Sequence, residues 1–329
     1  MDERTADLPS GNSQPGARLE ASAGPKYFNK HNDHVPLGIG YMVLATSLFA
    51  AASALTKWLV GIYPVGEVVF ARSFSSFLVC AAVMLPITGL SVYKTARPRD
   101  HLARGISQSI SQTLFALAFT LMPLAGAVSI NFSAPLFSAL ISIVWLKERA
   151  TVARWSALLI GFLGVLIVTN PGRNSFTLGA LFALGNAVLY GSVTVAVRRM
   201  TKTESANTLM IWQLTIIAFF HSFLLLFGVR WPVPIDWLMM FGMGFLNAVG
   251  QYFWTRSLSL APATAVAPFY YLMLVWALGF GYFIWGDIPS TGLLAGSAIV
   301  VGSGFFLFWR EARLQRSIAV VPQAPAKSG

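Results

Sequence analysis

The sequence is poor in charge and in the residue types that build catalytic or metal sites. Of its 329 residues, 11% are charged, whereas an average soluble domain has about 25%. The single cysteine, Cys80, excludes a disulfide framework and a cysteine-based metal site. No HExxH, Walker A or GxGxxG motif is present. We therefore expect no cofactor, no metal site and no catalytic residue.

Long apolar runs make up most of the chain. Hydrophobic residues are 56% of the sequence, and runs of about 20 apolar residues, the length that crosses a bilayer as a helix, recur after residue 36. The polar ends, 1–36 and 310–329, are expected to be tails, the first of them disordered. We predict an all-α integral membrane protein with ten transmembrane helices, at residues 37–58, 64–86, 103–122, 125–146, 152–170, 177–197, 205–227, 235–257, 262–285 and 290–309.

The basic residues predict the orientation of these helices. A net charge of +11 would suggest nucleic acid in a soluble protein, but here the Lys and Arg residues lie in short clusters between apolar runs. Cytoplasmic loops of membrane proteins carry an excess of Lys and Arg. With both tails in the cytoplasm, the outer side holds only Lys57, Arg173 and Arg230, and Arg72 lies within a span. We expect a multi-pass protein of the cell inner membrane with both termini cytoplasmic and no nucleic-acid partner.

The two halves of the chain resemble each other. LAGAVSI at 124–130 is echoed by LAPATAV at 260–266, and IVWLKE at 143–148 is echoed by YFIWGD at 282–287. This predicts two five-helix repeats, 37–170 and 177–309. Because five is odd, the second repeat must be inverted in the membrane. Inverted repeats are typical of secondary transporters, whose two halves can expose a central site to either side.

The segments SINFSAPLFSALISIVWLKERATVARWSALLIGFLGVLIVTNPG and LAPATAVAPFYYLMLVWALGFGYFIWGDIPSTG, with FARSF in the second span, resemble EamA-type members of the drug/metabolite transporter superfamily. The resemblance covers residues 37–309 and departs from the family at Asp287, where Glu is usual. It implies proton-coupled or facilitative movement of small metabolites through a central cavity. Members move amino acids, nucleotides, riboflavin, S-adenosylmethionine and amphipathic drugs, in either direction.

Two charged residues, Glu67 and Arg72, lie within the second span, where a charge costs about 2.5–3.5 kcal/mol. Five residues of helix turn the chain by about 500°, so the two side chains point about 140° apart and are poor partners within one helix. Arg72 is either a fixed cation that orients an anionic substrate group or one partner of a structural ion pair. Glu67 is the acidic residue placed for proton coupling.

Amide and aromatic side chains recur at helical spacing in other spans. If these stripes converge, they form a wet, aromatic-walled pocket for a flat or amphipathic metabolite. The alternative is that the amides bind helices together through interhelical hydrogen bonds. With Arg72 and Glu67, the candidate substrate-binding residues are Gln108, Gln112, Asn131, Asn186, Tyr190, Asn247, Gln251, Tyr271 and Trp276.

The sequence thus predicts a secondary active or facilitative transporter that moves a small metabolite through a central cavity by alternating access. A vitamin or cofactor such as riboflavin is one candidate, and export of amino acids, other metabolites or amphipathic drugs is the alternative. A membrane-embedded lipid-modifying enzyme is the alternative from a different class. Its partners are the substrate, the bilayer and, if transport is coupled, protons; the oligomeric state is left open.

A topology reporter fused after Arg173 tests the predicted orientation. Because the segment around Arg173 follows the fifth span, a periplasmic alkaline phosphatase fusion is expected to be active and a fluorescent cytoplasmic reporter dark. The matched fusion after Lys94 should give the reverse result. A cytoplasmic signal after Arg173 would overturn the assignment.

Overall fold

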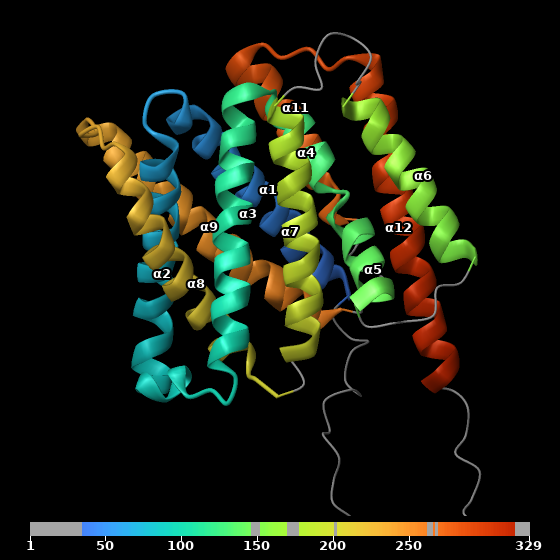
Figure 1. Cartoon of the computed structure of the whole chain (residues 1–329), viewed down its shortest axis with the longest axis horizontal. Helices are drawn as coiled ribbons and strands as arrows, with labels where there is room; N and C mark the ends of the chain where they lie inside the picture. The colour runs from blue at the N-terminus through green and yellow to red at the C-terminus, as the bar shows by residue number, and fades with distance from the viewer. Residues whose placement is uncertain are drawn as a thin grey trace, which may run out of the picture.

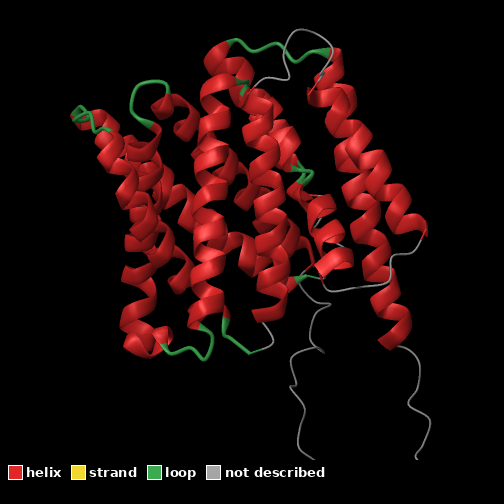
Figure 2. Ribbon diagram, in the orientation of Figure 1, coloured by secondary structure: helices red, strands yellow, loops and turns green. Residues whose placement is uncertain are grey.

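The chain is a bundle of helices. The computed structural model describes residues 35–145, 152–169, 178–200, 203–261, 266 and 269–319. Within these residues there are helices and turns but no strand, which confirms the predicted all-α class for this part of the chain (Figure 2). In chain order the elements of Figure 1 are α1 (Val35–Val60), α2 (Val65–Thr88), η1 (Gly89–Tyr93), α3 (Pro98–Leu121), α4 (Leu124–Asn131), α5 (Ala134–Trp145), α6 (Val152–Thr169), α7 (Leu178–Met200), α8 (Ala206–Ser222), η2 (Phe223–Phe227), α9 (Pro234–Leu260), α11 (Leu272–Trp285) and α12 (Thr291–Ala319).

The lengths and compositions of these helices suit a membrane. Five stretches are long and apolar enough to cross one, and three shorter apolar helices accompany them. Helices α3 and α9 have 24 and 27 residues and are less apolar. A total of ten transmembrane helices stays a prediction. The five long stretches are Pro36–Val60, Val65–Tyr93, Leu124–Val144, Leu178–Val197 and Ala206–Phe227.

The fourth predicted span, residues 125–146, is divided into two helices. α4 ends at Asn131, and α5 begins at Ala134. Pro135, in the first turn of α5, has no N–H, so the carbonyl of Asn131 lacks the donor that a continuous helix would provide. The sequence analysis expects one helix here, and the proline explains the difference.

The break packs against the second half of the chain. The ring centroid of Phe132, at the break, lies 5.8 Å from that of Tyr270 and 5.2 Å from that of Tyr271. Both tyrosines come just before α11, in the ninth predicted span. The fourth span of one half therefore meets the fourth span of the other half in the interior of the bundle.

Corresponding elements of the two halves pack in corresponding ways. α1 packs along α9 as α7 packs along α3. Because α1 of the first half corresponds to α7 of the second, and α3 to α9, these two contacts are equivalent. Helices α2 and α8 each continue into a 3₁₀ turn, and α3 and α9 each begin with a proline. α2 starts at the upper end of Figure 1 and α8 at the lower end. This opposite sense supports the predicted inverted repeat.

Two glycines allow the halves to approach closely. A β-carbon on Gly244 of α9 would overlap the Ser75 side chain and lie 2.7 Å from the Arg72 carbonyl oxygen of α2. At the matching contact, a β-carbon on Gly105 of α3 would overlap the Ile216 side chain of α8. Small residues at such crossings bring backbones close enough for side chains of neighbouring turns to form hydrogen bonds between the helices.

Gly244→Ala is expected to lower the melting temperature of the detergent-solubilised protein, because its methyl group must displace the backbone of α2, at a cost of about 1–3 kcal/mol. Gly242→Ala is the matched control, because nothing lies within 4 Å of a β-carbon there. Since alanine favours helix over glycine, the control should be neutral or slightly stabilising. Equal losses in both variants would contradict the close contact between α2 and α9.

Candidate functional site

Glu67 is buried in the first turn of α2, the helix that starts at the upper rim of the bundle (Figure 1). Its Oε2 accepts a 2.9 Å hydrogen bond from the backbone N–H of Arg230, in the segment between η2 and α9. At the same rim, the Tyr63 hydroxyl donates to the Asp236 carboxylate at 2.6 Å, and this bond raises the pKa of Tyr63. The start of α2 is thereby tied to the second half. The pair between Glu67 and Arg72 that the sequence left open is not formed.

A second carboxylate ties the halves together at the lower end. Glu204, just before α8, accepts a 2.7 Å hydrogen bond from the Thr95 hydroxyl between η1 and α3. Its other oxygen lies 4.0 Å from Nε2 of His101 in α3. Glu67 and Glu204 therefore occupy corresponding places, each near the start of the second helix of its half. Each binds the segment between the second and third helices of the other half.

The Arg72 side chain reaches from α2 to α9. Its Nη2 donates to Asn247 Oδ1 at 3.0 Å, and Asn247 Nδ2 donates to Ser76 Oγ at 3.3 Å. Ser76 Oγ in turn donates to the Gly244 carbonyl at 2.9 Å. Among the described residues, the buried Nε of Arg72 has no hydrogen-bond partner and no carboxylate pairs with this side chain. The guanidinium is therefore held by an amide and keeps donors for another ligand.

A second polar cluster joins α3, α4 and α7. The Ser111 hydroxyl donates to Asn186 Oδ1 at 2.7 Å, and Asn186 Nδ2 donates to Asn131 Oδ1 at 2.7 Å. Asn131 is the last residue of α4, so the cluster adjoins the break at Phe132. These bonds match the interhelical role of amides in membranes. Asn131 is only half-buried and can still meet a ligand.

Three predicted glutamines lie in the sequence next to, or one turn from, members of these clusters. Gln108 precedes Ser111 on α3 and is 5% exposed, and among the described residues its buried Oε1 has no hydrogen-bond partner. Gln112 on the same helix and Gln251, one turn beyond Asn247 on α9, are half-buried. An unpaired buried amide oxygen costs about 1–3 kcal/mol, so a ligand donor or a water molecule bound to Gln108 would stabilise it.

The three predicted aromatic residues take different positions. Tyr190 follows Asn186 by one turn of α7, is 40% exposed and lies close to Tyr270. Tyr271 stacks edge-on against Phe132, and its hydroxyl lies 2.6 Å from where a β-carbon on Gly304 of α12 would stand. Trp276 is 37% exposed on α11. Tyr190 thus lies one turn from the amide cluster on α7, and Tyr271 packs on the residue that follows Asn131.

His221 of α8 is a hydrogen-bonded packing residue, the role that the sequence favours for a histidine within an apolar run. Its Nδ1 lies 3.0 Å from Ser73 Oγ and 3.1 Å from the Val69 carbonyl of α2, and its Nε2 lies 3.2 Å from the Ser109 carbonyl of α3. The imidazole therefore joins three helices next to Arg72. Sequence reasoning missed Ser73 and Ser76 in this region, because serine is common in membrane helices and carries no signal there.

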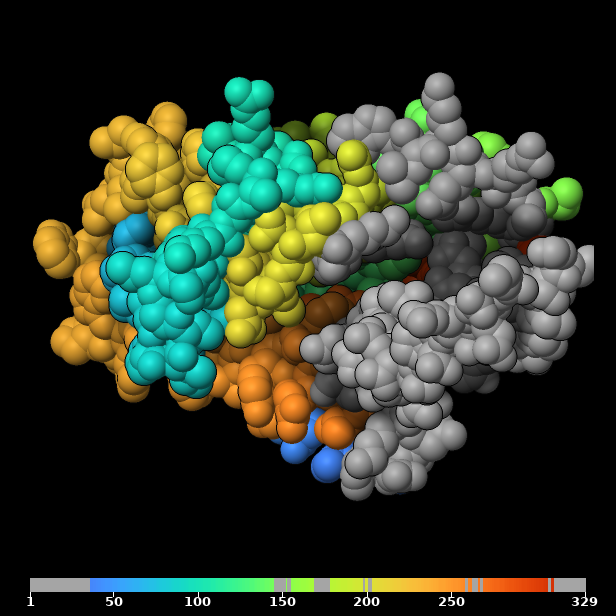
Figure 3. Space-filling view, turned by 90° about the horizontal axis from the view of Figure 1, so that it is seen from below, coloured from blue at the N-terminus to red at the C-terminus, as the bar shows by residue number. Residues whose placement is uncertain are grey.

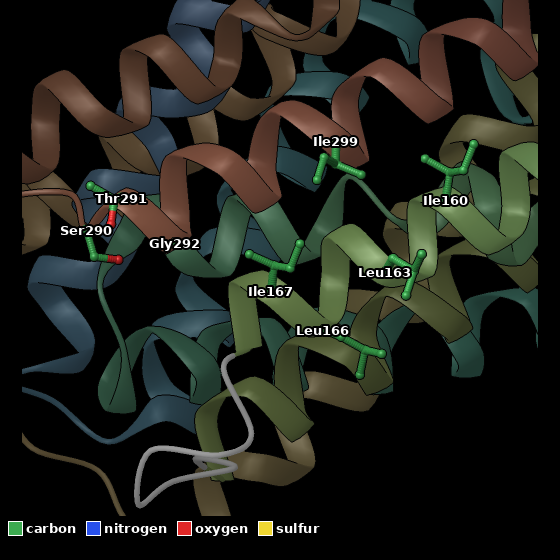
Figure 4. A pocket seen from close by; sticks show the side chains of 8 residues that line it. All are labelled: Ile160, Leu163, Leu166, Ile167, Ser290, Thr291, Gly292 and Ile299. Carbon is green, nitrogen blue, oxygen red and sulfur yellow. The ribbon is translucent and has the colours of Figure 1, made fainter.

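The surface is hollowed at the lower end of the bundle. Seen from below, the hollow lies beside the yellow end of α7 and the orange end of α9, and green atoms of the first half are visible deep within it (Figure 3). A separate groove of about 740 Å³ runs between α6 and α12, lined by Ile160, Leu163, Leu166, Ile167, Ser290, Thr291, Gly292 and Ile299 (Figure 4). None of the predicted site residues lines that groove, and its apolar walls suit lipid chains.

The family model described as "EamA-like transporter family" matches residues 36–170 and 177–309. The chain belongs to this family. The resemblance drawn from the sequence is confirmed, and the protein is a multi-pass membrane transporter of the drug/metabolite transporter superfamily that moves small metabolites.

Three relatives illustrate the range of the family. The riboflavin transporter of Vibrio cholerae is 29% identical over 74% of this chain and 85% of its own length. The S-adenosylmethionine uptake transporter of Rickettsia conorii is 26% identical over 83% of this chain and 93% of its own length. The pseudopaline exporter CntI of Pseudomonas aeruginosa is 27% identical over 82% of this chain and 95% of its own length. A solved crystal structure, 21% identical, matches 85% of this chain and 98% of its own with a TM-score of 0.57, and so shares the fold.

Glu67→Gln tests whether Glu67 is a tether or a proton carrier. Because glutamine retains an oxygen that can accept from the Arg230 N–H, we expect uptake within about twofold of wild type and an unchanged dependence on the proton gradient. Glu67→Ala removes the acceptor and should lower the melting temperature. Loss of gradient dependence in Glu67→Gln, with normal membrane abundance, would instead assign proton coupling to this residue.

Proposed function

We propose that the chain carries a small metabolite with a flat heteroaromatic ring and a polar tail, riboflavin first, across the inner membrane by alternating access. The observation that carries the proposal is the partly unsatisfied Arg72 guanidinium, held by Asn247 at the contact between the two halves. A buried cation kept inside a membrane helix is costly and typically marks a substrate pathway. The riboflavin and S-adenosylmethionine transporters among the relatives support this class of substrate.

The polar groups suit the tail and the ring edge of such a molecule. Arg72 would donate to a ring carbonyl or a carboxylate, and the free Oε1 of Gln108 would accept from a hydroxyl or a ring N–H. Asn131 and Asn186 would bind a hydroxylated chain. These contacts would also orient the ligand.

The aromatic groups suit the faces of the ring. Phe132, Tyr270 and Tyr271 form one cluster at the break between α4 and α5. Tyr190 lies near Tyr270 and next to the amide cluster. A flat ring stacked against this cluster would gain apolar contact without bending the site. We also propose Trp276 as a stacking residue of the same pathway.

S-adenosylmethionine is the second candidate, and one observation favours it. No described carboxylate pairs with Arg72, so the guanidinium is available for a substrate carboxylate, which S-adenosylmethionine has and riboflavin lacks. The two candidates therefore make different use of Arg72. Transport of other metabolites outward, as in the pseudopaline exporter, remains the alternative direction.

The membrane setting is part of the same proposal. Lys94, Arg97 and Arg99 lie between the end of η1 and the first turn of α3, which starts at the lower end of the bundle (Figure 1). By the positive-inside rule we propose that this end faces the cytoplasm, with both termini. The two repeats would then exchange inward- and outward-open states around the Arg72 region. We propose protons as the coupling ion only for the case that a proton gradient drives uptake. Glu67 would not carry the proton in that case, because its carboxylate is held at the rim by the Arg230 N–H.

Uptake into proteoliposomes tests the substrate. With labelled riboflavin and S-adenosylmethionine, each with and without a proton gradient, we expect saturable uptake of at least one. Arg72→Ala should lower its uptake about tenfold or more at normal membrane abundance, since a hydrogen bond from a charged group contributes about 1.5–3 kcal/mol. The control Arg230→Ala, which removes an exposed guanidinium at the rim, should stay within about twofold. Uptake of neither compound, or equal losses in both variants, would contradict the proposal.

A further inference from the structure

The last turn of α1 carries a lysine that neither polar cluster uses. Lys57 Nζ donates to the Met122 carbonyl at 2.8 Å and to the Phe119 carbonyl at 3.4 Å. These are carbonyls at the C-terminal end of α3, which have no partner within their own helix and lie at the negative end of its dipole. The ammonium therefore joins the upper ends of the first and third helices of the first half.

The same ammonium also contacts the second half. Its Nζ lies 5.2 Å from the ring centroid of Trp285, the last residue of α11. A cation over an indole face is attracted to it. Lys57 thus touches α1, α3 and α11 at once, in the upper part of the bundle.

Asp287 adds a negative charge beside this contact. Gly286, in the left-handed conformation with φ of 70°, ends α11, and the Asp287 N–H donates to the Gly281 carbonyl at 3.1 Å. Asp287 is close enough to attract Lys57 electrostatically, and among the described residues its buried Oδ2 has no hydrogen-bond partner. The turn after α11 therefore holds a carboxylate within reach of the lysine.

Lys57, in the last turn of α1, lies at the upper end of the bundle, opposite the hollow. Lys57 bridges the halves at the upper end, whereas the lower end is hollowed beside α7 and α9 (Figure 3). We propose that Lys57 is the latch of the upper gate: its bonds to α3 hold the ammonium in place, and its contact with Trp285 of α11 keeps that end closed and must break before the substrate site opens there. This inference rests on alternating access in the proposed function, and it assigns Lys57 as a positioning residue for transport.

The latch has a defined chemical basis. When the gate opens, water would replace Trp285 and Asp287 around the ammonium. Lys57→Met keeps most of the apolar stem that packs on Trp285 but removes the charged donor. Lys57→Arg keeps a cation that can donate to carbonyls and stack on an indole. The two variants therefore separate the charge from the bulk of the side chain.

Pulsed electron spin resonance distances in nanodiscs without substrate test the latch. Spin labels replace the exposed Thr120 at the end of α3 and Ile284 at the end of α11, in a Cys80→Ser background. Wild type should show mainly the short, closed distance. In Lys57→Met the ratio of long to short distances should rise about tenfold or more, because the cation that contacts Trp285 and attracts Asp287 of the other half is lost. Lys57→Arg should stay near wild type.

Two further variants keep the test decisive. Arg199→Met removes an exposed cation at the end of α7 and should leave the upper distance unchanged. Trp285→Leu removes only the indole contact and should shift the distances in the same direction as Lys57→Met, but less. Should Lys57→Met fail to fold, an unshifted Trp285→Leu overturns the proposal, as does an unshifted, folded Lys57→Met. Because no substrate is present, a failed uptake assay would leave this result unaffected.

Discussion

The hydrogen bond from Arg72 to Asn247 is the interaction on which the rest of the interior depends. It crosses from α2 in the first half to α9 in the second half, at a depth where an unpaired charge is costly. It forms because Gly244, one turn before Asn247, lets the two backbones approach. Ser76 then bonds to both the Gly244 carbonyl and Asn247. A single close contact thus fixes a cation between the two halves.

The other contacts between the halves follow the same inverted plan. Carboxylates near the starts of α2 and α8, Glu67 and Glu204, bind segments of the opposite half at the two ends of the bundle. Both tethers are formed in one state, so the α2 and α8 side is held at both ends. On the other side, the divided fourth span meets Tyr270 and Tyr271. This asymmetry fits a transporter that pivots on one side and opens on the other.

Much of this architecture could be predicted from the sequence, because a bilayer admits few solutions. The length of the apolar runs predicted the helical class. A repeat with an odd number of spans predicted that α2 and α8 run in opposite directions through the bundle. Arg72, Asn131, Asn186 and Asn247 were singled out as costly polar groups within apolar helices, and the structure joins them in two pairs. Whether they bind substrate stays a prediction.

Other features could not be read from one sequence. Helical spacing predicts which residues share a face of a helix but not which other segment that face contacts. The partner of Glu67, the backbone N–H of Arg230, could therefore not be predicted. Pro135 marks a helix start as readily as a break, so the division of the fourth span was missed. The Lys57 contacts involve backbone carbonyls of α3, which leave no trace in the sequence.

A structure determined with riboflavin or S-adenosylmethionine bound is the most direct measurement of the central claim, that Arg72 lies on the substrate pathway between the halves. The account predicts ligand density within hydrogen-bonding distance of the Arg72 guanidinium, with the ring against the Phe132, Tyr270 and Tyr271 cluster. Density confined to the groove between α6 and α12, with Arg72 bonded only to Asn247, would contradict it.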